Sequence, residues 1–144
     1  MSWKSMMMAA AVAKANPDLG DAEDIAEVTE EDAVAIRMLI RKQLVAFSTS
    51  DVMGAWSLCS QPIRETFRTP ERMFEVIRSR YPALAAPREV AFGGFRITPE
   101  GLAQTFQVVD DQGVAHHGLY LVRREEGAWR VNGAMLLPAM AEAA

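Results

Sequence analysis

The hydrophobic period of this chain changes near Val90, and that change constrains the fold more than any other feature of the sequence. Before Val90, apolar residues recur every three or four positions, which is the spacing of a helix that buries one stripe. The clearest such stripe is Ile36, Ile40, Leu44 and Phe47. After Val90, short segments rich in Val, Phe, Tyr and Trp alternate with turn residues, which is typical of antiparallel strands. Helices followed by a strand meander predict an α+β domain.

Three helices are expected in the first part of the chain. The first begins after Thr29, because Thr29-Glu30-Glu31-Asp32 is close to a capping box with acids in the first turn. The second covers about residues 52–60 and is closed by Pro62. Residues 63–68 are expected to connect it to the third helix. Thr69-Pro70-Glu71 starts that helix with a capping hydroxyl, a proline and an acid.

Four strands are expected after the helices, and each turn between them ends in glycine, which suits a hairpin loop that closes with a left-handed residue. A three-residue loop at 125–127 would place Leu121 opposite Val131, and a similar loop at 111–113 would pair Gln107 with His117. The predicted strands are Val90–Ile97, Ala103–Val109, Val114–Arg123 and Ala128–Leu137.

The predicted register assigns side chains to the two faces of the sheet, because successive strand residues point to opposite sides. One face is expected to hold Thr105, Gln107, His117, Leu119, Leu121, Trp129, Val131 and Met135. This face is expected to pack on the first helix. The core is then expected to be closed by Ile36, Ile40, Leu44, Trp56, Phe74, Leu121, Trp129 and Val131.

The second face of the predicted sheet is also apolar, although an antiparallel sheet with one wet face should alternate apolar with polar residues. An apolar patch of this kind usually marks an interface, and a twofold contact is the commonest way to bury it. The sequence therefore predicts a homodimer through the outer sheet face. The interface residues would be Phe106, Val108, Tyr120 and Val122.

Charge and cysteine content exclude several classes of partner. The 144-residue chain has a net charge of −4 and scattered bases, which argues against a nucleic-acid partner. Its single cysteine, Cys59, excludes an intramolecular disulfide and a Cys-rich metal site, and we expect it to be a small buried apolar residue. No apolar run approaches the ~20 residues of a membrane span.

The chain is expected to divide into a leader, one domain and a short tail. Residues 1–28 are predicted to be a flexible acidic leader, because 16–32 carries many acids and no Lys or Arg. An apolar stretch follows Lys4, and Ala13-Lys14-Ala15 has the pattern of an export cleavage site. Residues 1–15 would direct export if they act as a signal, and the chain is otherwise expected in the cytoplasm. Residues 29–138 form the domain and 139–144 the tail.

Several stretches together carry a resemblance to known proteins. They are Phe47–Asp51, Ala55-Trp56, Pro70–Pro82, Val108–Gly113 and Leu119–Gly133. With them, residues 33–138 resemble a family of uncharacterised bacterial domains within the nuclear transport factor 2-like superfamily. The resemblance implies a cone, in which a curved sheet wraps round the first helix, often with a pocket at the open end. That superfamily includes isomerases, dehydratases, transport factors and accessory domains, so the fold does not assign an activity.

The residues that could carry chemistry do not form a catalytic set. An isomerase of the ketosteroid kind needs a buried acid as base, yet the acids between Val90 and Ala139 all lie in predicted turns. His116 and His117 are neighbours on a strand and point to opposite faces, so they do not ligate one metal. We therefore expect no catalytic residue, metal or cofactor. The residues expected to contact a small ligand in the cone are His117, Gln107, Arg64, Arg68 and Trp56.

Three functions are consistent with these patterns. The first is a non-catalytic, dimeric domain that binds a small apolar or anionic ligand in the cone. The second is a small enzyme, of the isomerase or hydratase type, that uses a pocket histidine, His117, with Tyr120 or Arg64. The third is an accessory domain that docks a partner protein through its acidic leader.

Overall fold

The computed structural model of the chain describes residues 28–137. Within that range, helices precede an antiparallel sheet, which confirms the predicted α+β class. The predicted export signal, the tail and all of the predicted leader before Val28 lie outside the described residues. The helices are α3 (Glu30–Ser48), α4 (Val52–Ser57), α5 (Gln61–Phe67), α6 (Pro70–Arg80) and α7 (Pro82–Ala85). The strands are β1 (Glu89–Thr98), β2 (Gly101–Val109), β3 (Ala115–Glu125) and β4 (Ala128–Leu136).

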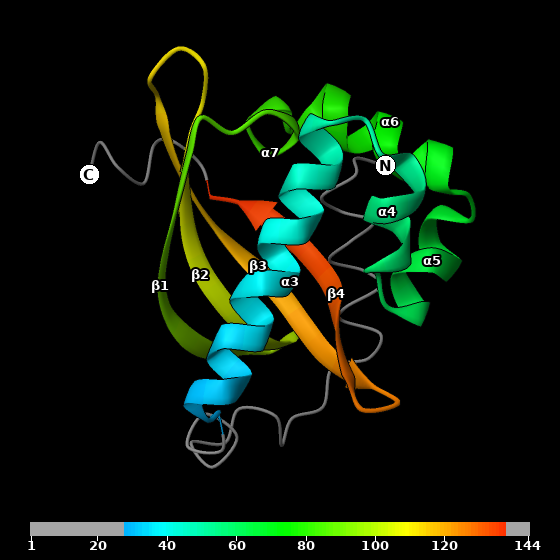
Figure 1. Cartoon of the computed structure of the whole chain (residues 1–144), viewed down its shortest axis with the longest axis vertical. Coiled ribbons are helices and arrows are strands. Elements are labelled where there is room, and N and C mark those ends of the chain that lie inside the picture. Colours follow the sequence, from blue (N-terminus) through cyan, green and yellow to red (C-terminus); the bar gives the residue numbers. More distant parts are fainter. Residues whose placement is uncertain (1–27, 138–144) are drawn as a thin grey trace.

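Helix α3 lies across one face of the four-stranded sheet, and α4, α5 and α6 gather beside its β4 edge (Figure 1). The predicted capping box starts α3. Thr29 Oγ1 accepts a hydrogen bond from the Asp32 amide at 3.0 Å, and the Thr29 amide donates to the Asp32 carboxylate at 3.3 Å. Ile36 and Ile40 of the predicted stripe are completely buried against the sheet. None of the helices in residues 28–137 is both long and apolar enough to cross a membrane.

The segment after α4 differs from the sequence prediction. Helix α4 ends at Ser57, and residues 61–67 form α5 instead of a connection. Ser60 is the reason, because its hydroxyl accepts a hydrogen bond from the Ile63 amide at 3.4 Å and caps a new helix. Pro62 lies in the first turn of that helix, where a missing N–H costs nothing, so it starts α5 as well as ending the segment before it. Helix α6 begins at the predicted Thr69 cap.

The four strands pair in the order β1-β2-β3-β4 as an antiparallel meander. The predicted register between β2 and β3 is confirmed, with Gln107 opposite His117 and Thr105 opposite Leu119. The predicted register between β3 and β4 is wrong, because Val122 and not Leu121 lies opposite Val131.

A tight turn and a bulge cause the difference between β3 and β4. The loop has only two residues, Glu126 with φ 51° and Gly127 with φ 80°, and two left-handed residues make the mirror-image turn that suits a hairpin. Further along, the register shifts, so that Leu121 lies opposite Gly133 and Asn132 is an extra residue in β4.

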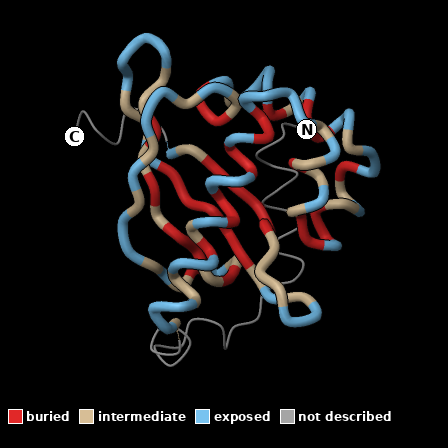
Figure 2. The backbone as a smooth tube through the Cα atoms, in the orientation of Figure 1, coloured by how far each residue is buried: buried red, intermediate tan, exposed pale blue. Residues whose placement is uncertain are grey.

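The faces of the sheet are the reverse of the prediction. Phe106, Val108, Tyr120 and Val122 are between 0% and 4% exposed and form one core with α3. Figure 2 shows buried stretches in α3 and in the strands of the sheet. The surface predicted for a homodimer is therefore the interior of the domain. The sequence prediction erred because both faces are apolar, so alternation alone did not identify the inner one.

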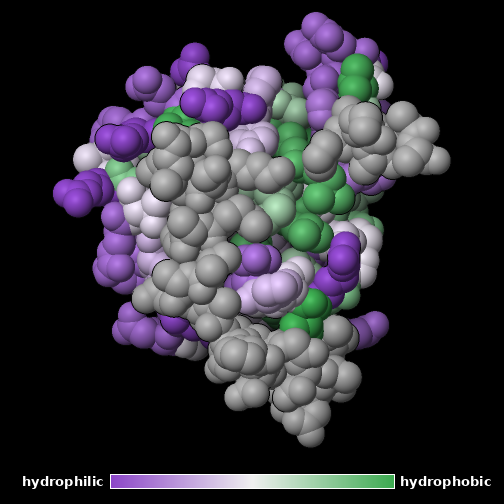
Figure 3. All heavy atoms as spheres, turned by 180° about the vertical axis from the view of Figure 1, so that it is seen from behind, coloured by the Kyte–Doolittle hydropathy of each residue, from purple (hydrophilic) through white to green (hydrophobic). Residues whose placement is uncertain are grey.

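The sheet face opposite α3 carries a second, smaller buried cluster of Ala103, Leu119, Leu121 and Met135. Apolar and polar residues share this side of the molecule in Figure 3. Of the predicted core residues, Leu121 lies in this second cluster and not against α3. Trp56 and Trp129 are only partly buried at the edge of the main core, whereas Val131 lies within it.

Candidate functional site

The structure separates the predicted ligand residues into two hollows. Trp56, Arg64 and Arg68 line a cleft of about 420 Å³ on α4 and α5. Gln107 and His117 line a hollow of about 340 Å³ on the sheet face opposite α3. The single pocket expected from the sequence is therefore replaced by two surfaces on different parts of the molecule.

The α4–α5 cleft, lined by Trp56, Gln61, Arg64, Glu65 and Arg68, is built by helical spacing. The four lining residues other than Trp56 follow the pattern i, i+3, i+4, i+7 from Gln61 to Arg68, the residue that ends α5, so that they share one side of the helix. Helix α4 contributes the indole. Sequence reasoning missed Gln61 and Glu65 because α5 was not predicted. The spacing from Gln61 to Glu65 to Arg68 was the signal that could have found them.

Arg64 forms one wall of the cleft. Its guanidinium carbon lies 5.9 Å from the centre of the Trp56 ring, a cation–π arrangement. Its Nη2 donates a hydrogen bond to the carbonyl oxygen of Ser57 at 3.0 Å. Its Nε is buried and has no hydrogen-bond partner in the part of the chain that the structure describes. A buried donor without an acceptor costs about 1–3 kcal/mol, so this guanidinium is only partly satisfied by the protein itself.

Arg68 ends α5 in a strained conformation, with φ 75° and ψ −42°. A non-glycine residue with positive φ in this region costs of order 1–3 kcal/mol. The side chain is exposed and, among residues 28–137, forms no hydrogen bond or ion pair. The positively charged Arg68 side chain therefore lies at the cleft on a strained backbone. No side-chain hydrogen bond or ion pair within residues 28–137 accounts for that strain.

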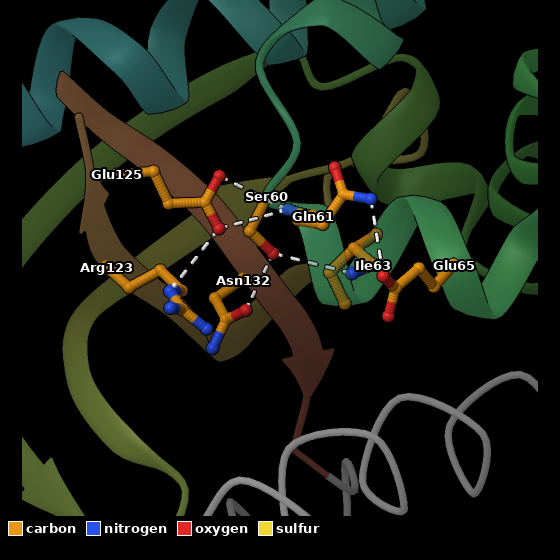
Figure 4. A network of polar contacts seen from close by, with 7 residues as sticks. All are labelled: Ser60, Gln61, Ile63, Glu65, Arg123, Glu125 and Asn132. Atoms are coloured by element: carbon orange, nitrogen blue, oxygen red, sulfur yellow. Dashed lines mark hydrogen bonds and ion pairs between the residues drawn. The ribbon is translucent and has the colours of Figure 1, made fainter.

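A network of polar contacts fixes the start of α5 to β3 and β4 (Figure 4). The Ser60 hydroxyl donates to Asn132 Oδ1 at 2.7 Å, and both residues are buried. The Glu125 carboxylate accepts a hydrogen bond from the backbone N–H of Gln61 at 3.0 Å. The same carboxylate lies 3.4 Å from Arg123 Nε. The extra residue of the β4 bulge, Asn132, therefore has a function in the fold, since it anchors the start of the helix that carries the arginines.

The second hollow has a different character. Besides Gln107 and His117 it is lined by Arg96 and Thr105, with glycine backbone at Gly93. The sequence placed Thr105 on the same predicted sheet face as Gln107 and His117, but it did not single out Arg96.

The alternative catalytic set is not brought together. Tyr120 is completely buried in the main core. His117, three positions earlier in β3, is exposed on the opposite face of the sheet. Burial raises the pKa of the Tyr120 phenol. Arg64 lies in the other hollow, on α5.

Two of the acids in the described part of the chain stabilise a turn and a helix end. Asp110 accepts hydrogen bonds from the backbone amides of Gln112 and Val114, each at 2.9 Å. Its carboxylate also lies 3.0 Å from His116 Nε2. The hydrogen bond from His116 lowers the pKa of Asp110. Asp51 caps α4 by accepting the Gly54 amide at 3.0 Å. Within residues 28–137, no cluster of three or more His, Cys, Asp or Glu side chains could hold a metal ion.

Cys59 is a buried core residue, as predicted, with 2% of its surface exposed. Gln43 Nε2 lies 3.4 Å from its sulfur, and the Met73 sulfur lies 3.3 Å away. Burial raises the pKa of the Cys59 thiol to about 12, so the thiol stays protonated and closed to substrates in the folded domain.

Comparison with known proteins identifies a family without an assigned activity. No curated protein and no solved structure matches the chain. One family model, described as Domain of unknown function (DUF4864), matches residues 29–144, which is most of the chain. The chain therefore belongs to the DUF4864 family.

Proposed function

We propose that this domain is a non-catalytic binding module that holds a small anionic ligand in the α4–α5 cleft, on Arg64 and Arg68. One observation carries the proposal. Two guanidinium groups line the same cleft, and in the described part of the chain neither forms an ion pair with a carboxylate. The protein therefore leaves both positive charges available to a ligand.

The chemistry of the two side chains selects the ligand. Guanidinium groups are planar forks that match carboxylates and phosphates, often through two parallel hydrogen bonds. The Arg64 guanidinium is only partly satisfied by the protein, because its buried Nε has no acceptor among the described residues. Trp56 adds an apolar wall to the cleft. A small carboxylate or phosphate with some apolar surface fits these groups.

The strain at Arg68 supports a ligand-binding role. A glycine would adopt φ 75° more easily than arginine does. Strained backbone of this kind clusters at functional sites, where the surrounding structure maintains it. The polar network at the start of α5 ties the helix that leads to Arg68 to β3 and β4.

We also propose that residues 29–138 are a single domain related to the nuclear transport factor 2-like superfamily. The position of α3 across a four-stranded antiparallel sheet supports this relation. The homodimer remains a prediction without an assigned surface, because its expected interface residues are in the core. Sedimentation velocity would determine the oligomeric state.

The substitution Arg68→Gly is expected to increase stability and to weaken anion binding, so the two effects can be measured separately. We expect it to raise the free energy of unfolding by about 1 kcal/mol, because glycine adopts the positive φ without strain. We expect the same change to weaken anion binding at least about tenfold, because it removes one guanidinium. Denaturant unfolding measures the first effect. Titration with N-acetyl-L-leucine and with inorganic phosphate, followed by backbone amide NMR shifts, measures the second.

Two further variants control this experiment. Arg68→Gln removes the charge but keeps a non-glycine residue, so it should weaken binding without the gain in stability. Arg72→Gln removes one charge from an exposed position on α6, outside the cleft, and should change neither quantity. Equal binding of the probes by Arg68→Gly and by the parent protein would contradict the proposed function.

A further inference from the structure

We infer that the ligand of the α4–α5 cleft is a zwitterion of the α-amino acid type, with its carboxylate on Arg64 and Arg68 and its ammonium group on Glu65. The inference rests on the proposed function and adds the chemical class of the ligand. It comes from a carboxylate that lines the same cleft as the two arginines.

Glu65 is positioned as a binding group. It is exposed on α5, and Gln61 Nε2 donates a hydrogen bond to its Oε2 at 3.3 Å. Figure 4 shows the Gln61 amide and the Glu65 carboxylate directed toward one another from neighbouring turns of the helix. Since Gln61 occupies one carboxylate oxygen, the other is open to a donor. The backbone N–H of Gln61 donates a hydrogen bond to the Glu125 carboxylate, which fixes the position of Gln61 at the start of α5.

The opposite charges in the cleft do not neutralise each other. Glu65 follows Arg64 and precedes Arg68 by three positions, a spacing that permits ion pairs on a helix. Nevertheless, within residues 28–137, Glu65 forms no ion pair with either arginine. The cleft therefore presents a separated negative and positive pole. A ligand that carries both charges engages both poles, whereas a plain anion engages only the two arginines.

The size of the cleft and its apolar wall agree with this class. The cleft of about 420 Å³ is widely open to solvent and is large enough for a single amino acid. Trp56 offers apolar surface beside the charged groups, and its ring also holds the Arg64 guanidinium in place. The side chain of the ligand would pack on this indole while its two charges engage α5.

Three probes that share one side chain test the inference on the full chain. L-leucine carries both charges, N-acetyl-L-leucine carries only the carboxylate, and L-leucinamide carries only the ammonium group. We expect L-leucine to bind at least about tenfold more tightly than either derivative, because only L-leucine satisfies both poles. NMR titration of the backbone amides gives each dissociation constant and maps it to α4 and α5.

The neutral substitution Glu65→Gln tests whether Glu65 binds the ammonium group of the ligand. Glu65→Gln should reduce L-leucine binding to the level of N-acetyl-L-leucine and leave the binding of N-acetyl-L-leucine unchanged or stronger. The matched control is Glu89→Gln, which removes an exposed carboxylate from β1, far from the cleft lining, and should alter no probe.

The outcomes distinguish this inference from the proposed function. If N-acetyl-L-leucine binds as tightly as L-leucine and Glu65→Gln changes neither, the zwitterion inference is overturned while the anion-binding function stands. If none of the three probes binds, both are overturned. A tenfold preference for L-leucine that disappears only in Glu65→Gln supports both.

Discussion

Replacing Tyr120 with aspartate is expected to unfold the domain. The phenol ring is completely buried, lies 5.1 Å from the Phe106 ring between centroids, and packs in the same core as α3. The substitution removes the ring, which costs about 3–5 kcal/mol, and adds a buried carboxylate without a partner. Because a domain of this size is stable by only about 5–15 kcal/mol, the cooperative unfolding transition should be lost. Circular dichroism and denaturant unfolding measure the effect.

Tyr120→Phe is the matched control at the same position. The Tyr120 hydroxyl is buried and has no hydrogen-bond partner among the described residues. Its removal should leave stability unchanged or raise it by up to about 1 kcal/mol, because an unsatisfied buried polar group is lost and the ring remains. A Tyr120→Asp protein that stays folded and merely changes from dimer to monomer would place Tyr120 on the outer surface and contradict the structure.

Replacing Gly118 with alanine is expected to destabilise the domain by about 3 kcal/mol through overpacking. Gly118 lies opposite Phe106 in β2 and Leu136 in β4. A Cβ at this position would fall 2.8 Å from two carbons of the Phe106 ring and would collide with the carbonyl oxygen of Met135. The backbone oxygen cannot move without disturbing the β3–β4 ladder, so the cost cannot be relieved by a side-chain rotation. Thermal or denaturant unfolding gives the value.

Gly94→Ala is the corresponding control in β1. A Cβ at Gly94 would have no heavy atom within 4 Å, so the substitution adds no collision. It should change stability by less than about 1 kcal/mol, with a small gain expected from the stiffer unfolded chain. Equal and small effects of the two substitutions would show that β3 does not pack on β2 and β4 in the register described.

The local elements of this fold were readable from the sequence because their signals are local. Thr29 and Thr69 predicted two helix starts through capping hydroxyls, and the structure places both caps as expected. The change of period at Val90 predicted a strand meander, and the turn before Ala115 fixed the β2–β3 register. Helix α5 was missed because Pro62 can end one segment and start the next, and only the Ser60 cap distinguishes the two.

The candidate site was predictable in part. Trp56, Arg64 and Arg68 were identified from their residue types and do share one cleft. His117 and Gln107 were also identified and do lie together, but in a different hollow. Glu65 was not identified, because its role depends on a helix and on a hydrogen bond from Gln61 that residue types alone do not reveal. The strain at Arg68 is likewise a property of the folded backbone.

The sequence by itself determined the α+β class, the starts of α3 and α6, the strand order and the burial of Cys59, because capping, periodicity and turn residues act over a few positions. Only the tertiary structure decided which face of the sheet is the inside. Both faces carry apolar residues, and a register shift of one residue exchanges neighbouring side chains between them. The two-residue turn at Glu126-Gly127 shifts the β3–β4 register beside the loop, and the bulge at Asn132 shifts it again. Asn132 accepts a hydrogen bond from Ser60, the cap of α5, which lies 72 positions away in the sequence.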